Sequence, residues 1–343
     1  MKWTPDNIIL SRTDSIGDVV LSLPVAKVLK EHFPGIKIAL LGREYTRQVA
    51  NACDYIDQFI EYQEFLHHPV KIGGEPPQCI VHVLPERQVA ARAKKLHIPV
   101  RIGTTNRLFH WKTCNRLVRL SRKNSPLHEA QLNLRLLEPL GIVQACSLEE
   151  IGQWYGLRPL PVLPEPESRL IQKGVYNLIL HPRSRGSARE WGLHNFIQLI
   201  KALDPAVYRI FISGTKEEQK SLHPLFEAAG GRVTDLTGRL TLAELIAFIA
   251  QCNGLVACST GPLHLAAALG KDALGIYAPL HSIHPRRWKP VGPKAQVFVV
   301  DRVCSDCKGM KAPCHCIEEV SWKSIRDELD RRSAFVTRQP EKV

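Results

Sequence analysis

The sequence lacks the features that define several protein classes. No apolar run approaches the ~20 residues that span a bilayer, and the opening residues, MKWTPDNIIL, do not form a secretory signal. Hydrophobic residues make up 44% and charged residues 23%, and no low-complexity tract occurs, which excludes a disordered or collagen-like chain. We therefore expect a folded cytoplasmic protein whose ten cysteines are thiols or metal ligands rather than a disulfide framework.

Acidic residues are missing from one long stretch, although the chain as a whole carries 33 of them against 46 Lys and Arg, a formal charge of +13. Between Glu86 and Glu129 every charged residue is a cation. This pattern fits a solvated helix face with a loop, but solubility alone favours mixed signs. The alternative is a surface for an anionic sugar, lipid headgroup or nucleic acid. The stretch contains Arg87, Arg92, Lys94, Lys95, Arg101, Arg107, Lys112, Arg116, Arg119, Arg122 and Lys123.

What is present is an alternation of short apolar runs with helical patterns, restarting once along the 343 residues. Asn7–Ser11 and Tyr176–His181 each open such a series, which predicts two α/β domains with parallel sheets. The proline-rich segment 157–168 predicts a linker. We expect Rossmann-like lobes at 1–160 and 169–343, facing a cleft, with ligands beyond the carboxyl ends of the strands.

The loop after the first strand, residues 12–18, holds Ser15, Gly17 and Asp18. Ser15 and Asp18 suit a helix cap, and Asp18 also suits a catalytic carboxylate. The loop has one glycine, where a dinucleotide fingerprint needs G-x-G-x-x-G, and this weighs against a nicotinamide dehydrogenase.

Three later strand-to-helix loops favour a diphosphate ligand. Residues 181–191 hold three arginines and a glycine, which suit bidentate contacts to phosphate. Residues 259–264, Ser-Thr-Gly-Pro-Leu-His, begin a helix with exposed N–H donors, a ready anion site. Glu217, after another strand, suits ribose hydroxyls. Each loop also has a structural alternative. Residues 181–191 could be an ordinary basic surface loop, His264 could be a packed or capping histidine, and Glu217 could cap its helix.

Taken in order, these motifs resemble the ADP-heptose:lipopolysaccharide heptosyltransferase family, the inverting family 9 glycosyltransferases of GT-B fold. The anchors are SIGDVVLSLP at 15–24, REW at 189–191, LTGRLTLAEL at 236–245, STGPLHLAAALG at 259–270 and PRRWKPVG at 285–292. The resemblance spans nearly the whole chain. Many family members have Asp where this chain has Ser259, which leaves open another donor sugar.

The resemblance implies a reaction and roles for residues. Heptose passes from ADP-heptose to a hydroxyl of an inner-core lipopolysaccharide acceptor of lipid A–Kdo type, without a catalytic cofactor, at the cytoplasmic face of the inner membrane. Asp18 is the implied general base, and the N-terminal lobe binds the acceptor through Arg92, Lys94, Lys95, Arg116 and Arg119. The C-terminal lobe binds the donor through Arg183, Ser184, Arg185, Arg189, Glu217 (or Glu218), Ser259, Thr260, Gly261 and His264.

Cys304, Cys307, Cys314 and Cys316 form a C-x-x-C and a C-x-C close together. They predict either a structural Zn or Fe site or reduced thiols. Two alternative functions stay open at this stage. One is a family 9 transferase that uses another nucleotide sugar or a protein hydroxyl, and the other is a basic nucleic-acid-binding α/β protein.

Overall fold

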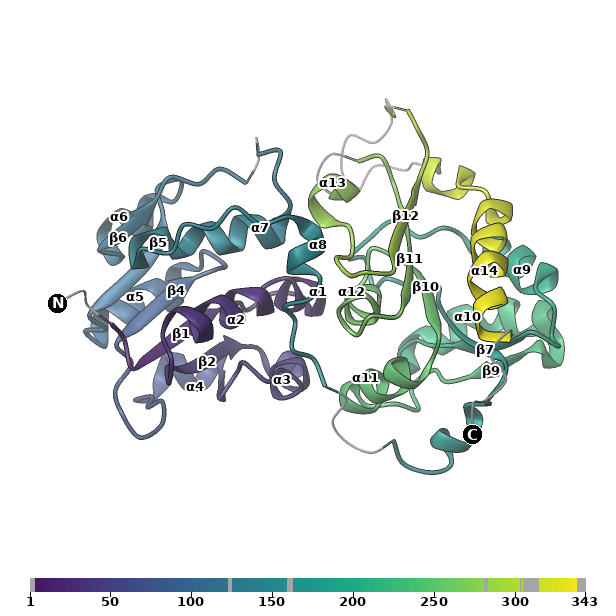
Figure 1. The fold of residues 1–343 in the computed structure, drawn as a ribbon, viewed down its shortest axis with the longest axis horizontal. Coiled ribbons are helices and arrows are strands. Elements are labelled where there is room, and N and C mark those ends of the chain that lie inside the picture. Colours follow the sequence, from purple (N-terminus) through teal and green to yellow (C-terminus); the bar gives the residue numbers. More distant parts are fainter. Residues whose placement is uncertain are drawn as a thin grey trace. The chain divides into compact units, whose positions relative to one another are not determined.

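The computed structural model describes residues 4–122, 125–158, 163–280, 283–302, 304 and 315–337. The chain divides into two compact units, Met1–Arg158 and Pro159–Val343. Each unit has its own sheet and core (Figure 1) and is described here by itself.

The N-terminal unit is built on a parallel six-stranded sheet in the order β3-β2-β1-β4-β5-β6. Its central strand β1 is buried along its whole length, as expected for an apolar run covered on both faces. The other strands lie in register beside it, so that Ser11 of β1 is level with His82 of β4. The strands are β1 Asn7–Ser11, β2 Lys37–Gly42, β3 Gln58–Glu61, β4 Cys79–His82, β5 Val100–Thr104 and β6 Arg116–Val118.

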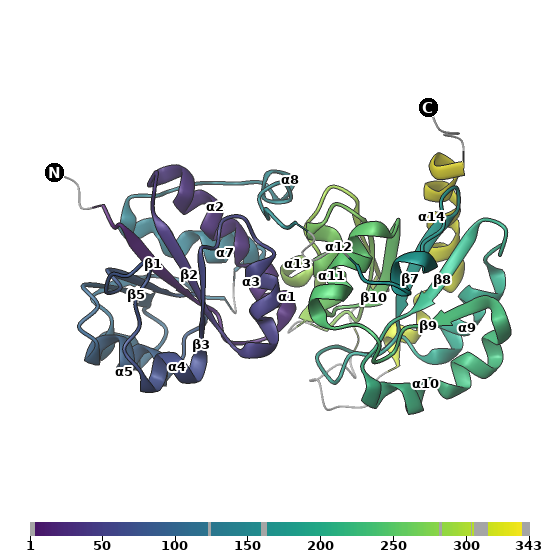
Figure 2. The ribbon, with the colours of Figure 1, turned by 90° about the horizontal axis from the view of Figure 1, so that it is seen from below.

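Helices cover both faces of this sheet, with α2 and α7 on one face and α4 and α5 on the other (Figure 2). They are α1 Ile16–Val20, α2 Leu23–His32, α3 Arg47–Asn51, α4 Tyr62–His67, α5 Arg87–Lys95, α6 Leu108–Thr113, α7 Glu129–Leu134 and α8 Leu148–Ile151, with 3₁₀ turns η1 Glu44–Thr46 and η2 Arg135–Leu140.

Two helices differ from the sequence prediction. The pattern at 18–32 predicts one helix, but the structure has α1 and α2, because Pro24 lacks an N–H and fits only the first turn of a new helix. The pattern at 132–140 also predicts one α-helix. There, α7 gives way to the 3₁₀ turn η2, which contains Pro139 and ends at Gly141, whose φ is 82°.

The C-terminal unit repeats the architecture with the strand order β12-β11-β10-β7-β8-β9, again all parallel. Its strands are β7 Tyr176–His181, β8 Tyr208–Ile212, β9 Val233–Asp235, β10 Gly254–Cys258, β11 Asp272–Tyr277 and β12 Ala295–Val299. Its helices and 3₁₀ turns are η3 Glu167–Leu170, α9 Leu193–Ala202, α10 Lys216–Ala229, η4 Gly230–Arg232, α11 Leu242–Gln251, α12 Gly261–Ala268, α13 Pro285–Trp288, η6 Cys316–Glu319 and α14 Trp322–Thr337.

Helices α9, α10 and α14 pack together on one face of the second sheet, and α11 and α12 pack on the other (Figure 2). A close approach fixes α12. A Cβ added at Gly292 would overlap the backbone carbonyl of Ala267, so only glycine fits at this point of the chain. The predicted class of two parallel-sheet α/β units is confirmed.

Candidate active site

Asp18 lies in the first turn of α1, directly beyond the carboxyl end of β1. Ser15 caps this helix: its hydroxyl accepts from the Asp18 N–H at 3.5 Å and donates to Asp18 Oδ2 at 2.5 Å. The helix cap predicted at Ser15 therefore forms, and the catalytic role of Asp18 stays a prediction. The side chain of Asp18 keeps 18% exposure, and Ser15, which binds its Oδ2, is itself exposed.

The other oxygen, Asp18 Oδ1, is held by the Arg12 guanidinium. Arg12 is almost completely buried, and its guanidinium also pairs with Asp14 at 2.7 Å and with Glu129 at 3.2 Å. Burial acts to lower the pKa of Arg12, but the surrounding carboxylates raise it above its ordinary value. Arg12 therefore stays charged and fixes Asp18.

The cluster continues through Glu129, which is itself buried and begins α7. Arg122 donates to Glu129 Oε1 at 2.9 Å and to the carbonyl oxygen of Val83 at 2.9 Å. Arg122 is thus paired with an acid, although the sequence around it contains none. Buried Arg12, half-buried Arg122 and three carboxylates tie α1, α7 and the loop after β4 together.

Asp14 is the carboxyl group of this cluster with a shifted pKa. Burial raises the pKa of Asp14 to about 6, the nearby Asp18 charge adds to the rise, and Arg12 opposes it. A group with this pKa gains or loses its proton close to neutral pH. The charge beside Asp18 therefore depends on pH in the range where the protein would work.

The predicted acceptor residues do not gather at one place. Arg119 follows β6 at the carboxyl edge of the sheet, the same edge as Asp18, whereas Lys94 and Lys95 end α5 at the opposite edge. Arg116 begins β6 and is exposed. Arg92 is half-buried and donates to the carbonyl oxygens of residues 65 and 68, both at 3.1 Å. Of these five, Arg92 has a structural role already, and Arg119 lies at the edge that Asp18 occupies.

The predicted donor residues follow three adjacent strands, β10, β7 and β8. Because these strands are parallel, the loops at 259–261, 182–191 and 213–218 leave the same edge of the sheet. This edge is where open parallel sheets bind their ligands. His181, at the end of β7, contacts the Ser213 hydroxyl at 2.9 Å and so links two of these loops.

Within the 182–191 loop, the residues divide by their contacts. Arg183 is engaged inside the unit, with Nη1 2.8 Å from Glu190 and Nη2 donating to the Ser221 carbonyl oxygen at 2.6 Å. Ser184 is also used within the loop. Its N–H donates to Glu190 at 3.0 Å, and its hydroxyl donates to the carbonyl oxygen of residue 188 at 2.9 Å. Glu190 thus organises the loop. Arg185 is exposed and has a φ of 50°.

The REW motif ends in a buried anchor. Trp191 is fully buried, and its indole N–H donates to the Val320 carbonyl oxygen at 2.8 Å. Arg189, two residues earlier, is half-buried. The tryptophan therefore anchors the end of the loop, and half-buried Arg189 lies two residues before it.

The loop after β10 places Ser259, Thr260 and Gly261 at the start of α12, with Pro262 in its first turn. The Thr260 hydroxyl is buried and, among the described residues, has no hydrogen-bond partner. His264 is buried one turn later, and its N–H donates to the Thr260 carbonyl oxygen at 3.4 Å. A helix N-terminus with an unsatisfied buried hydroxyl is suited to bind an anion.

The two glutamates at the start of α10 have different roles. Glu218 accepts from the Thr215 N–H at 2.8 Å and completes the capping box. Glu217 is exposed, and hydrogen bonds from its own N–H and from Thr215 lower its pKa, with a contribution from the Arg185 charge. The structure thus brings Glu217 near Arg185 and leaves Glu217, rather than Glu218, able to contact a ligand.

The cysteine cluster falls largely outside the described residues. Cys307 and Cys314 lie there, while Cys304 and Cys316 are described and pack against the core of the C-terminal unit. Among the described residues, no group of three or more His, Cys, Asp or Glu side chains could hold a metal. A structural metal at this cluster has no support from the described part and stays a prediction.

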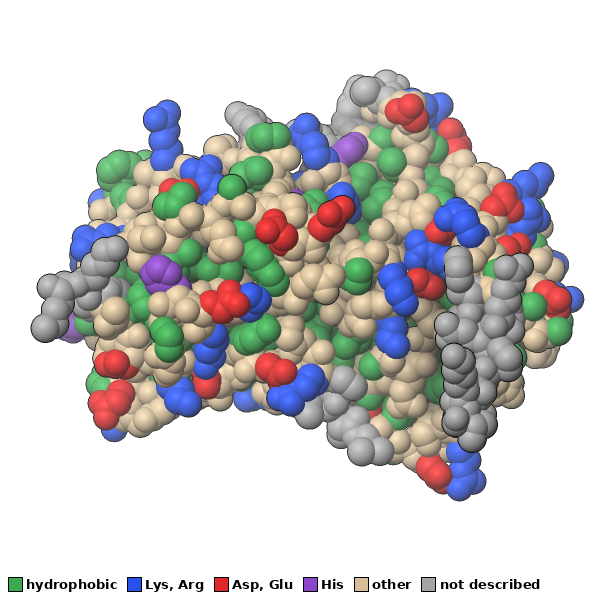
Figure 3. All heavy atoms as spheres, viewed as in Figure 1, with side chains coloured by type: hydrophobic (Ala, Val, Ile, Leu, Met, Phe, Trp, Pro, Cys, Tyr) green, Lys and Arg blue, Asp and Glu red, His purple; other side chains and the backbone are tan. Residues whose placement is uncertain are grey.

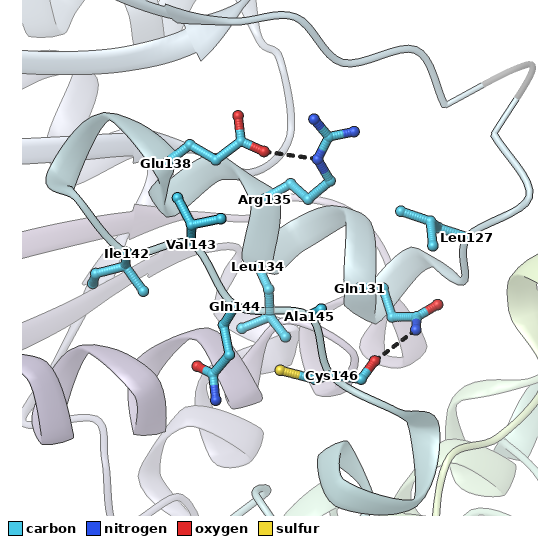
Figure 4. Close-up of a pocket in the computed structure, with 10 residues that line it drawn as sticks. All are labelled: Leu127, Gln131, Leu134, Arg135, Glu138, Ile142, Val143, Gln144, Ala145 and Cys146. Atoms are coloured by element: carbon cyan, nitrogen blue, oxygen red, sulfur yellow. Dashed lines mark hydrogen bonds and ion pairs between the residues drawn. The ribbon is translucent and has the colours of Figure 1, made fainter.

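A pocket of about 280 Å³ lies elsewhere in the N-terminal unit, between the α7–η2 segment and residues 142–146 (Figure 4). Gln131 closes one side by donating to the Cys146 carbonyl oxygen at 2.8 Å. None of the residues predicted for acceptor binding or catalysis lines it. It is lined by Leu127, Gln131, Leu134, Arg135, Glu138, Ile142, Val143, Gln144, Ala145 and Cys146.

Sequence reasoning missed the residues that hold the site together. Arg12 directly follows the first strand, a position that deserved weight, but its partner Glu129 is 117 residues away. Glu190, inside the REW motif, and His181 at a strand end were also missed as organising residues. Their positions were visible in the sequence, but their partners were not.

Comparison with known proteins agrees with this geometry. Residues 165–318 match the model of glycosyltransferase family 9 (heptosyltransferase). A putative glycosyltransferase of Haemophilus influenzae is 24% identical over 83% of this chain and 86% of its own length. Lipopolysaccharide heptosyltransferase 3 of Escherichia coli is 23% identical over 79% and 83%.

Among solved structures, ADP-heptose lipopolysaccharide heptosyltransferase II of E. coli covers 96% of this chain and 99% of its own. It has a TM-score of 0.75 and 16% identity. The family's GT-B fold is therefore the fold of this chain. Residues 165–318 of this chain are therefore a glycosyltransferase family 9 domain, and the chain is a glycosyltransferase.

Proposed function

We propose that this chain transfers heptose from ADP-heptose to a hydroxyl of an inner-core lipopolysaccharide acceptor, with inversion at the anomeric carbon. The observation that carries the proposal is Asp18, a carboxylate beyond the central strand whose Oδ1 is fixed by buried Arg12 and whose Oδ2 accepts from the exposed Ser15. The names of the related lipopolysaccharide heptosyltransferases support the substrate class.

Asp18 acts as the general base in this scheme. The acceptor hydroxyl replaces the Ser15 hydroxyl at Asp18 Oδ2, while Arg12 keeps Oδ1 in place. The acceptor oxygen forms its bond to the anomeric carbon as its proton passes to Asp18, and the bond from that carbon to the ADP oxygen breaks. The electron pair of that bond leaves with ADP. The ion pair with Arg12 holds the Asp18 carboxylate in place for this proton transfer.

The C-terminal unit stabilises the leaving diphosphate. The N–H groups at the start of α12 and the buried Thr260 hydroxyl form the anion site, and Arg189 and Arg185 add positive charge. These groups oppose the charge that develops on the leaving phosphate. Glu217, which is exposed and ionised, accepts from the ribose hydroxyls. His264 lies one turn into α12 and completes this side of the site.

The basic side chains of the N-terminal unit bind the acceptor. Arg119 lies at the Asp18 edge and is the predicted acceptor residue best placed to contact a phosphate or carboxylate near the reacting hydroxyl. Lys94, Lys95 and Arg116 face more distant charges of the same glycolipid or of the membrane that carries it. We place the enzyme at the cytoplasmic face of the inner membrane, where such an acceptor is exposed.

Donor binding gives the first test. The full chain is screened by thermal shift against ADP, GDP, UDP and dTDP and their sugars, because a ligand that binds the native state raises its melting temperature by mass action. We expect ADP and ADP-heptose to stabilise the protein most, and a Thr260→Val variant to lose most of that shift. Stabilisation by another nucleotide alone would contradict the donor assignment.

Ser259 favours a second candidate within the same family, a transferase that uses another nucleotide sugar or a protein hydroxyl. Serine at this point removes a negative charge beside the anion site. A different sugar or a second phosphate could then be accepted there. The same screen separates the two candidates, since the second predicts its strongest shift with a nucleotide sugar other than ADP-heptose.

A further inference from the structure

The helix α6 carries an apolar surface that the catalytic scheme does not use. Leu108 is 87% exposed and Trp111 is 61% exposed. They are three residues apart and so lie on the same face of the helix. Among the described residues, the large apolar side chains that remain exposed are Tyr45, Leu108, Trp111, Val143 and Val299. Single exposed side chains are common, but of the described helices only α6 has two of them on one turn.

Trp111 is held in a fixed orientation rather than free to fold back. Its indole N–H donates to the Thr105 carbonyl oxygen at 2.9 Å. The polar atom of the side chain is therefore satisfied by the protein, and much of the apolar ring remains in water. On the opposite side, His110 is buried and accepts from the Thr104 N–H at 2.9 Å, which anchors α6 to β5.

Cations surround this apolar turn. Arg107 precedes α6, Lys112 lies in its last turn, and both are exposed. Lys94 of the adjacent α5 donates to the Lys112 carbonyl oxygen at 2.9 Å, which brings a third cation to the end of α6. Figure 3 shows apolar and basic side chains together at the end of the N-terminal unit where Figure 1 places α6 and β6.

Among the described residues, the acids that flank this stretch and the acid of the adjoining η2 turn bind other groups. Residues 87–128 contain no acid. Glu86 accepts from Thr13 and Tyr62, and Glu129 pairs with buried Arg12. Glu138, on the η2 turn that packs against β6, pairs with Arg135 at 2.8 Å.

We propose that α6 is the membrane-contact element of this protein, with Leu108 and Trp111 inserted into the headgroup region of an anionic bilayer. Arg107, Lys112 and Lys94 contact the phosphates around them. Tryptophan and leucine on one face with Lys and Arg beside them are the side chains that partition into this interface, and anionic headgroups complement the unopposed charge. No helix among the described residues is long and apolar enough to cross a membrane, so this contact is peripheral. The inference deepens the proposed membrane location and rests on that part of the proposed function.

The test is sedimentation of the full chain with vesicles of 70% phosphatidylcholine and 30% phosphatidylglycerol. The variant Leu108→Ser/Trp111→Ser is compared with Val143→Ser, a matched control because Val143 is 83% exposed in the same unit but belongs to the segment after η2 rather than to α6. We expect the double variant to lose vesicle affinity at least about tenfold, and the control to bind as the unaltered chain does. The single variant Leu108→Ser should lose vesicle affinity about threefold. Because Leu108 is 87% exposed, this variant removes little contact within the protein and therefore controls for misfolding.

Two results would overturn the proposal. One is equal vesicle binding by the double variant and the unaltered chain, which would show that the membrane contact is electrostatic and that Leu108 and Trp111 do not insert. The other is an unaltered chain that ignores anionic vesicles but binds a single-stranded oligonucleotide through Leu108 and Trp111, which would assign the surface to nucleic acid. ADP binding is measured on the same preparations, so failure of the donor proposal would be seen separately from failure of the membrane proposal.

Discussion

Replacing Arg12 with methionine tests the buried cluster that holds Asp18. Methionine fills a similar volume but leaves Asp14, Asp18 and Glu129 without their shared cation; Glu129 then keeps Arg122 alone. Removing one partner of a buried ion pair costs about 3–5 kcal/mol, because the remaining charge is left uncompensated. At about 1.4 kcal/mol for each factor of ten, this is two to almost four powers of ten in the opening equilibrium.

Hydrogen–deuterium exchange measures this loss in the N-terminal unit by itself. Peptides from β1 and β4 should lose about a hundredfold or more of their protection in Arg12→Met at pH 7, while peptides from β7 should change little. Arg135→Met is the control, because Arg135 belongs to an exposed pair with Glu138, and exposed pairs contribute about 0–1 kcal/mol. The loss in Arg12→Met should shrink toward pH 4 as the carboxylates take up protons. A loss below tenfold at pH 7 would refute the reasoning.

Three further predictions concern other parts of the two units. The pKa of Asp14 is raised to about 6, so its contribution favours the folded state most below pH 4 and is lost as pH rises through 6. Asp14→Asn should remove this slope in stability between pH 4 and 6, measured by urea denaturation; an unchanged slope would contradict the assignment. Ser15→Ala should lower the unfolding free energy by about 1 kcal/mol, measured by urea denaturation, yet keep kcat within about fivefold, since the acceptor replaces that hydroxyl. Gly292→Ala should lower the melting temperature of the C-terminal unit through an overlap costing about 1–3 kcal/mol, whereas Gly231→Ala, which meets no atom within 4 Å, should not.

The central strands of both units were predictable because they are buried on both faces. Asn7–Ser11 and Tyr176–His181 are short apolar runs, and the structure has strands with those same bounds. The strands β5 and β6 were not predicted. They carry Arg101 and Arg116 among the cations of the basic stretch, so their sequence lacks the apolar run that marks a buried strand.

For the site, local patterns could place residues on loops but could not find their partners. The Ser15 cap was predictable because a capping serine and Asp18 are three residues apart. The contact of Arg12 with Glu129 was not, because it forms only when the sheet brings α7 beside β1. The same limit explains Arg183. Its place in an arginine-rich loop predicts a phosphate contact, but its guanidinium binds Glu190 and the Ser221 carbonyl oxygen instead.

The most direct test of the proposed reaction is the rate of ADP release from ADP-heptose and a lipid A–Kdo acceptor, measured for the unaltered chain and for Asp18→Asn. Asparagine keeps the shape of the side chain but cannot take up the acceptor's proton. General base catalysis contributes about 10²–10⁴-fold, so turnover should fall by at least a hundredfold while the affinity for ADP stays within about twofold. Near-normal turnover by Asp18→Asn would contradict the account.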